Sequence, residues 1–425
     1  MYNLAGADFS GKVFESQVSQ LWQLQVIDKV GLATEHGQPL DVIYPGRPND
    51  DRGADFRDAV ISANRILLRG DIEVHVRSSD WYAHGHDRDP FYNGVILHVV
   101  LRHNSHRATS LQNGRDVPVL ALEKYLSFSP SASQGPPCVQ ATPEAVAAFL
   151  DEAGGARFLG KADRFSTRLS HNGAAQVLFE GIMEALGYVK NSPPFLELAR
   201  RLPLSILESV AGSPISDKTC LVQLQTLLLS TAGLVPPLPC SLGLPVIEPM
   251  SSQTWQQFKV RPQNSPGRRL AAMSHLLVRY RKRGLLDELI GKVTAIDNLG
   301  QYDILEKAFT VIVGDQSGRS LALLGRERAA VIVINVLLPF SYAWGHLSDR
   351  PELTRKALPL YRHYPGRVMN SIEKHMVRQL GLSRKLVSSA SRQQGLLHIY
   401  KELCIQGKCG ECALNKPHSG QHVHV

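Results

Sequence analysis

Hydrophobic periodicity separates the chain into an N-terminal part that favours strands and a longer part that favours helices. Residues 12–30 carry apolar side chains at helical spacing, and strand-like runs follow at 56–61, 66–76 and 95–101. A helix followed by hairpin strands, a connector and a further strand is typical of an α/β unit. We therefore predict an α/β N-terminal domain built on a small mixed sheet.

The rest of the chain has a different pattern. Residues 127–142, SFSPSASQGPPCVQAT, are rich in Ser, Pro and Gly, which is typical of a linker. Beyond them the periodicity is helical almost throughout, and Thr142 and Ser265, each followed by proline, predict helix starts. The predicted segments are an α/β domain at 1–126, the linker at 127–142, a mainly α-helical region at 143–403 and a Cys/His tail at 404–425.

Residues 70–76, GDIEVHV, alternate between apolar and ionisable side chains. Side chains alternate across a strand, so one face carries the apolar residues Ile72, Val74 and Val76, and the other carries Asp71, Glu73 and His75. The apolar face suits packing against a helix. The polar face is costly to bury unless water solvates it or a cation lies between the carboxylates. A solvated strand face and a cation site are the two interpretations.

A cation site here has a definite composition. Asp55, on or near the preceding strand, can join Glu73 as a second oxygen ligand for Mg²⁺ or Mn²⁺, because hard cations favour sparse carboxylate sites completed by water and phosphate. The imidazole of His75 can orient or deprotonate an attacking water, since its ordinary pKa lies near neutral pH.

This order of elements resembles the core of the PD-(D/E)XK nucleases, in which an Asp and a Glu hold the metal and a lysine two residues after the Glu assists the water. The resemblance implies a restriction-endonuclease-like fold, with Asp55 and Glu73 as catalytic metal ligands and Glu15 as an acidic residue on the first helix that also binds the metal. His75 stands where the lysine is expected. Two functions are therefore open: a metal-dependent phosphodiesterase acting on DNA or RNA, and a catalytically inactive, nuclease-like protein that binds nucleic acid.

A second resemblance spans most of the chain. The blocks GDIEVHVRSSDWYAHGHDRDPFYNGVILHVV, LGYVKNSPPFLELARRLP, RPQNSPGRRLAAM and INVLLPFSYAW are similar to the signature blocks of an uncharacterised bacterial family, the domain of unknown function 2851. Membership implies that most of the chain belongs to a single family unit, and the family has no established activity.

The connector after the Glu-x-His strand holds His84 and His86, followed by acidic residues. A His-x-His pattern is part of the metallo-β-lactamase motif, but two of the four ligand positions of that motif hold other residues here. The two histidines either lie at the rim of the site built on Glu73, where they contact phosphate or a second metal, or belong to a solvated connector. His98 lies in an apolar strand and is expected to be a hydrogen-bonded core residue.

The C-terminus gathers Cys404, Cys409 and Cys412 within nine residues, although the chain has six cysteines in total. This spacing predicts a structural zinc site with Cys₃His ligation, and an iron–sulfur cluster is the alternative. His418 is the favoured fourth ligand, and the other histidines considered are His398, His422 and His424. Clustered thiols of this kind also favour a reducing, cytoplasmic compartment.

Charge favours an anionic partner. The formal net charge is +9, which points to nucleic acid first. Arg268 and Arg269 fall in the first turn of a predicted helix, where the helix dipole favours anions and two guanidiniums would suit a phosphate. The longest apolar run, 329–345, is short for a membrane span and holds Asn335 and Pro339, so we expect a buried helix and no membrane. The polar N-terminus predicts no signal peptide. The sequence makes no prediction of oligomeric state.

Overall fold

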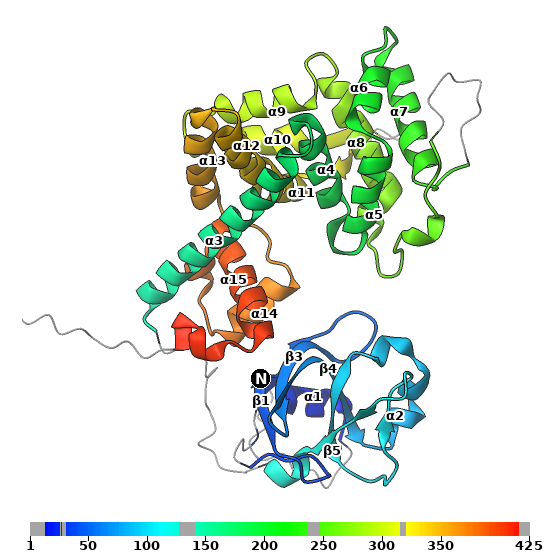
Figure 1. The fold of residues 1–425 in the computed structure, drawn as a ribbon, viewed down its shortest axis with the longest axis vertical. Helices are drawn as coiled ribbons and strands as arrows, with labels where there is room; N and C mark the ends of the chain where they lie inside the picture. Colours follow the sequence, from blue (N-terminus) through cyan, green and yellow to red (C-terminus); the bar gives the residue numbers. More distant parts are fainter. Residues whose placement is uncertain are drawn as a thin grey trace, which may run out of the picture. The chain divides into compact units, whose positions relative to one another are not determined.

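The computed structural model describes residues 13–25, 27, 31–126, 141–236, 247–314 and 320–415. The chain forms two compact units, an α/β unit and a helical unit (Figure 1). The α/β unit takes its residues from Met1–Leu150, Met369–Leu386 and Gly395–Val425, and the helical unit takes its residues from Asp151–Val368 and Val387–Gln394. This grouping differs from the linear division expected from the sequence. Most of the predicted linker, at 127–140, lies outside the described residues.

The α/β unit is built on a mixed sheet, as predicted. Its strand order is β1-β3-β4-β5-β8, with β2 paired to β3; β1 and β3, and β3 and β4, are antiparallel, whereas β4, β5 and β8 are parallel. The strands are β1 (Leu40–Tyr44), β2 (Arg47–Pro48), β3 (Phe56–Ala63), β4 (Ile66–Arg77), β5 (Val95–Arg102) and β8 (Val119–Ala121). A small separate ladder joins β6 (Thr109–Ser110) to β7 (Asp116–Val117). The three predicted strand runs are β3, β4 and β5.

One face of the sheet packs against the first helix, α1 (Glu15–Leu24). Ile72 and Val74 of β4 lie in the same buried cluster as Leu21 and Trp22 of α1, which confirms the prediction for the apolar face. The helix is shorter than the apolar pattern of 12–30 suggested. It ends because Gln25 adopts a left-handed conformation with φ of 52°, which stops helical hydrogen bonding.

Segments from the C-terminus complete the α/β unit. The Tyr44 hydroxyl of β1 lies 2.7 Å from Nε2 of His375 on α14 (Ser371–Gln379), and the Tyr400 hydroxyl of α15 (Ala390–Glu402) donates to the Asp58 carboxylate. Arg69 of β4 donates to the Gln406 carbonyl over 2.9 Å. The sequence assigned these segments to the helical region and to a separate tail, but their side chains are held by the sheet.

The helical unit is mainly α-helical, as predicted, and buries a core rich in aromatic side chains that includes Phe158, Phe179 and Phe340. Thr142 caps the first of its helices through a bond from the Ala145 amide. The helices are α3 (Pro143–Leu169), α4 (Ala174–Leu186), α5 (Tyr188–Arg201), α6 (Leu204–Ala211), α7 (Asp217–Thr231), α8 (Pro266–Tyr280), α9 (Leu285–Thr294), α10 (Tyr302–Phe309), α11 (Arg326–Ile332), α12 (Leu338–Leu347) and α13 (Pro351–His363). A hairpin of β9 (Val311–Gly314) and β10 (Ser320–Leu324) interrupts them.

The apolar run at 329–345 forms one continuous helix, Arg326–Leu347, in which α11 and α12 are joined by a π-helical segment at Val333–Leu337. By length and composition alone this helix could cross a membrane, but 67% of its most apolar window is buried inside the structure. Such burial is typical of the core helix of a globular domain, which agrees with the buried helix expected from the sequence.

Candidate metal centre

The structure brings Asp55 and Glu73 together through the main chain. Asp55 immediately precedes β3, and Glu73 lies in the middle of β4, the strand paired with β3. The Asp55 amide donates to Oε2 of Glu73 over 3.0 Å, and the Val74 amide donates to Oδ2 of Asp55 over 3.1 Å. These reciprocal bonds hold the Asp55 side chain beside Val74 and the Glu73 side chain beside the main chain of Asp55, and their sharing of one metal ion stays a prediction.

The ionisable face of β4 is buried, so the interpretation as a solvated strand face is wrong. Only 5% of Glu73 and 1% of His75 is exposed. The neighbouring Asp71 is paired with the Arg57 guanidinium, which balances its charge. Glu73 differs, because among the described residues its ion pairs are formed with histidines alone. Its negative charge therefore has no permanently cationic partner within contact distance.

Three imidazoles surround Glu73. Nε2 of His86 lies 3.2 Å and Nε2 of His75 lies 3.7 Å from Oε1 of Glu73, and His75 Nε2 lies 3.1 Å from His84 Nδ1. The ligand atoms of the three histidines all lie within 4.8 Å of one another. Gly85 adopts a left-handed φ of 74° between the two connector histidines, a conformation that glycine accepts without strain. His84 is exposed, as a rim residue would be, whereas His86 is buried inside the cluster.

A fourth histidine lies behind this group. His98 of β5 is fully buried and is aligned with Glu73 in the parallel register of β4 and β5. Its Nε2 lies 2.9 Å from His75 Nδ1, and its Nδ1 lies 3.3 Å from the Thr109 hydroxyl. The prediction of a hydrogen-bonded core histidine is confirmed. The contact between His98 and His75 was not predicted, because the parallel register that aligns their strands is a property of the sheet.

Glu15 lies at the edge of the cluster. It is the first residue of α1, its side chain is 45% exposed, and its Oε1 lies 3.9 Å from His84 Nδ1. The contact that the structure gives it is therefore with an imidazole, and its effect on the two buried carboxyl groups is electrostatic. The predicted metal-binding role of Glu15 stays a prediction.

Burial shifts the protonation of the whole cluster. Burial, followed by repulsion from Glu73, raises the pKa of Asp55 to about 7, and burial raises the pKa of Glu73 to about 8, with a smaller contribution from Glu15. Burial lowers the pKa of His75 and of His86. The imidazoles of His75 and His86 are thus neutral near pH 7, which is the state that binds metals, and a divalent cation would favour ionised carboxylates.

The predicted phosphate-binding arginines have protein partners. Arg269 is only 4% exposed, and its guanidinium donates to the Leu323 carbonyl and to the Asn264 side chain. Arg268 donates to the Ala322 carbonyl over 2.6 Å. Both side chains therefore connect the start of α8 to β10 by hydrogen bonds. These bonds use part of the donor capacity of the two guanidiniums, and phosphate binding by Arg268 and Arg269 stays a prediction.

The structure does not assemble the cysteine tail. Among the described residues, the ligand atoms of Cys404, Cys409 and Cys412 do not lie within 4.8 Å of one another, and the histidine cluster alone meets that distance. The favoured fourth ligand, His418, lies outside the described residues, as do His422 and His424. The zinc or iron–sulfur tail therefore stays a prediction.

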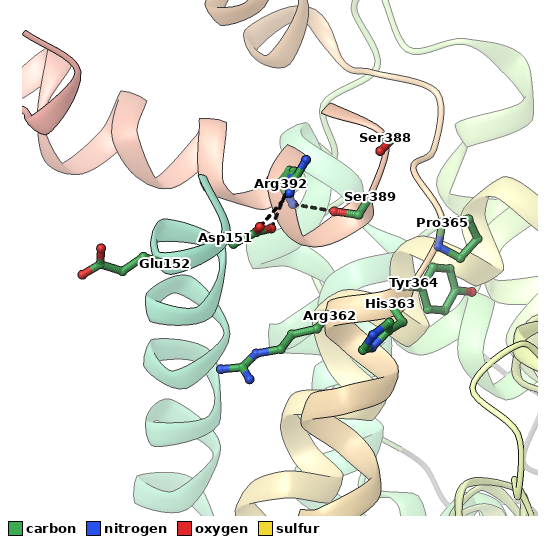
Figure 2. Close-up of a pocket in the computed structure, with 9 residues that line it drawn as sticks. All are labelled: Asp151, Glu152, Arg362, His363, Tyr364, Pro365, Ser388, Ser389 and Arg392. Atoms are coloured by element: carbon green, nitrogen blue, oxygen red, sulfur yellow. Dashed lines mark hydrogen bonds and ion pairs between the residues drawn. The ribbon is translucent and has the colours of Figure 1, made fainter. Parts of the chain in front are cut away.

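A separate open pocket of about 680 Å³ lies in the helical unit (Figure 2). It lies between Asp151 and Glu152 of α3, the C-terminal end of α13 and the start of α15. Its Arg392 is bound to Asp151 at 2.8 Å, and the dashed lines in Figure 2 mark this pair and the bond from the Arg392 amide to the Ser389 hydroxyl. In this pocket the charges of Arg392 and Asp151 are paired with each other. The α/β unit instead gathers several possible metal ligands at one place, so the histidine and carboxylate cluster is the better candidate site.

The fold and the cluster define a two-unit protein whose α/β unit carries a candidate metal centre. The chain belongs to the family described as protein of unknown function (DUF2851), whose model matches residues 15–239 and 242–367. Neither curated proteins nor solved structures gave a significant match. The family match includes the strands and the connector that form the cluster, and it supplies no activity.

Proposed function

We propose that the protein is a metal-dependent phosphodiesterase that acts on DNA or RNA. The observation that carries this proposal is the carboxylate pair of the half-buried Asp55 and the buried Glu73, held by reciprocal main-chain bonds and without an arginine or lysine in contact with Glu73 among the described residues. Such a pair suits a divalent cation that polarises a phosphodiester and lowers the pKa of a bound water.

The order of elements supports the same proposal. An opening helix, an antiparallel hairpin carrying the acidic residues, a connector and a parallel strand follow one another in the order that the resemblance to the PD-(D/E)XK nuclease core implies. In this proposal Asp55 and Glu73 hold Mg²⁺ or Mn²⁺, and His75, at 3.7 Å from Glu73, lies where it can orient the attacking water. The net charge of +9 favours a polyanionic substrate.

A second candidate is a nuclease-like scaffold that binds nucleic acid without cleaving it. One observation favours it: both ring nitrogens of His75 already contact other histidines, so this side chain is less free to take a proton than the lysine that the motif normally carries.

The test is a cleavage assay with plasmid, single-stranded DNA and RNA in the presence of Mg²⁺ or Mn²⁺. Wild type is compared with Asp55→Asn and Glu73→Gln, and Glu123→Gln, an exposed carboxylate of the same unit, serves as the matched control. We expect cleavage by wild type and by the control, and its loss in the two site variants. Salt-sensitive binding without cleavage, unchanged by Glu73→Gln, would instead establish the scaffold.

A further inference from the structure

Glu73 presents its two oxygens to different surroundings. Oε2 accepts the Asp55 amide on the side where the carboxylates meet, whereas Oε1 faces the nitrogens of His75 and His86. One carboxylate therefore separates an oxygen-lined position from a nitrogen-lined position. Hard cations such as Mg²⁺ suit the first position, but three imidazoles are the ligands that borderline transition metals prefer.

The spacing of the donor atoms fits one ion. Two ligand atoms bound at about 2.0–2.1 Å in a tetrahedral site lie roughly 3.3 Å apart. His75 Nε2 and His84 Nδ1 lie 3.1 Å apart, and Oε1 of Glu73 lies 3.2 Å from His86 Nε2 and 3.7 Å from His75 Nε2. These distances lie on either side of the ideal value, so small rotations of the side chains would bring the donors around an ion.

His86 provides an independent observation. The residue is 7% exposed, and its buried Nε2 makes no hydrogen bond among the described residues, although Oε1 of Glu73 lies 3.2 Å away. The ring is fixed by stacking on Tyr92, with centroids 3.9 Å apart, and by an edge contact with Trp81. A buried ring nitrogen that has no hydrogen-bond partner destabilises the folded protein unless it binds a ligand.

Behind the cluster, His98 and Thr109 allow the tautomer of His75 that metal binding requires. If His75 Nδ1–H donates to His98 Nε2, then His98 Nδ1–H donates to the Thr109 hydroxyl, and both contacts are satisfied. This assignment leaves the lone pair of His75 Nε2 directed toward His84 and Glu73. Metal-binding histidines commonly have an outer partner of this kind, which orients the ring.

We propose that His75, His84 and His86 bind a divalent transition metal ion of the zinc class, with Glu73 beside it supplying negative charge and His98 acting as a positioning residue. The inference deepens the proposed function, because it makes His75 a metal ligand instead of the group that orients the water. It concerns metal binding, which can be measured whether or not the protein cleaves nucleic acid.

The test is titration of the metal-stripped full-length protein with Zn²⁺, by calorimetry, and with Co²⁺, by visible absorption. The variants are His84→Ala, at an exposed position where folding is least at risk, His86→Gln, and His98→Gln at the positioning residue. His106→Ala, an exposed histidine of the same unit, is the control. Each protein is also tested with the three tail cysteines replaced by serine, so that any metal bound by the tail is removed. Amide hydrogen exchange of β4 and β5 verifies that each variant is folded.

We expect one ion per chain in the background without tail cysteines, with a Co²⁺ spectrum that lacks a thiolate charge-transfer band. Affinity should fall at least roughly tenfold in His84→Ala and His86→Gln, and roughly 10–100-fold in His98→Gln with the stoichiometry retained. No binding by folded wild type, or binding unchanged in both ligand variants, would overturn the inference. Mg²⁺-dependent cleavage that is lost in Glu73→Gln, together with a Zn²⁺ affinity unchanged in His84→Ala and His86→Gln, would overturn the inference and leave the phosphodiesterase proposal intact.

Discussion

Replacing Glu73 by Gln should stabilise the metal-free protein at high pH. The side chain is 5% exposed, and burial places its pKa at about 8, against an ordinary value of 4.5. Between these values the folded state holds a proton that the unfolded state has lost. The contribution of Glu73 to stability is therefore fully present below pH 4.5 and is lost as the pH rises toward 8. The amide variant has the same shape and no charge, so it escapes this loss.

The size of the effect follows from the shift in pKa. Each pKa unit corresponds to about 1.4 kcal/mol, and coupling to Asp55 means that the two groups share the shift. We expect Glu73→Gln to exceed wild type by about 2–5 kcal/mol at pH 8–9 and to match it near pH 4.5. With a saturating divalent metal the order should reverse, because the variant loses a ligand.

The measurement is amide hydrogen exchange of peptides from β4 and β5 across pH 5–9 with chelator present, since these strands report on the α/β unit alone. Glu123→Gln, an exposed carboxylate of the same unit, is the control and should change stability by less than about 0.5 kcal/mol. A constant difference between Glu73→Gln and wild type at every pH would refute the reasoning, because it would show that the carboxyl group titrates normally in the folded protein.

Three further predictions concern structure. Burial lowers the pKa of His375 to about 4, so the α/β unit should lose about 1–3 kcal/mol as the pH falls from 6.5 to 4, and His375→Gln should flatten that slope in urea unfolding. Glu306, 1% exposed and bound to Arg326 and Arg367, should cost about 3–5 kcal/mol when replaced by Ala, measured as thermal unfolding of the helical unit. Arg269→Gln should destabilise that unit by about 1–3 kcal/mol, and an unchanged salt dependence of nucleic-acid binding would exclude a phosphate contact.

Local periodicity was sufficient to predict the centre of the sheet. The runs that form β3, β4 and β5 are long, rich in β-branched residues and bounded by polar turns. Their local pattern was therefore enough to specify strands without contacts from the rest of the chain. The short β1 and β8 were not predicted, because strands of five and three residues depend on pairing with neighbours more than on their own pattern.

The candidate site was predicted only in part, for a related reason. Asp55, Glu73 and His75 belong to adjacent strands of one hairpin, so spacing along the chain was enough to bring them together. The approach of His98 depends on the parallel register between β4 and β5, which no local pattern encodes. The contact of Tyr400 with Asp58 joins residues 342 positions apart, which is why the C-terminal segments were assigned to the wrong unit.

The energetics of the cluster bear on its function. Glu73, His75, His86 and His98 are each less than 9% exposed, and most of the contacts among them join groups that would both have to be neutral near pH 7. Apolar side chains of the same size would stabilise this face of the sheet more than the ionisable ones do. The opposite face, which packs against α1, is apolar in this way. The destabilising arrangement is therefore best explained by a bound cation that offsets the burial of the carboxylates, which makes metal binding by the folded protein the measurement on which the functional proposals depend.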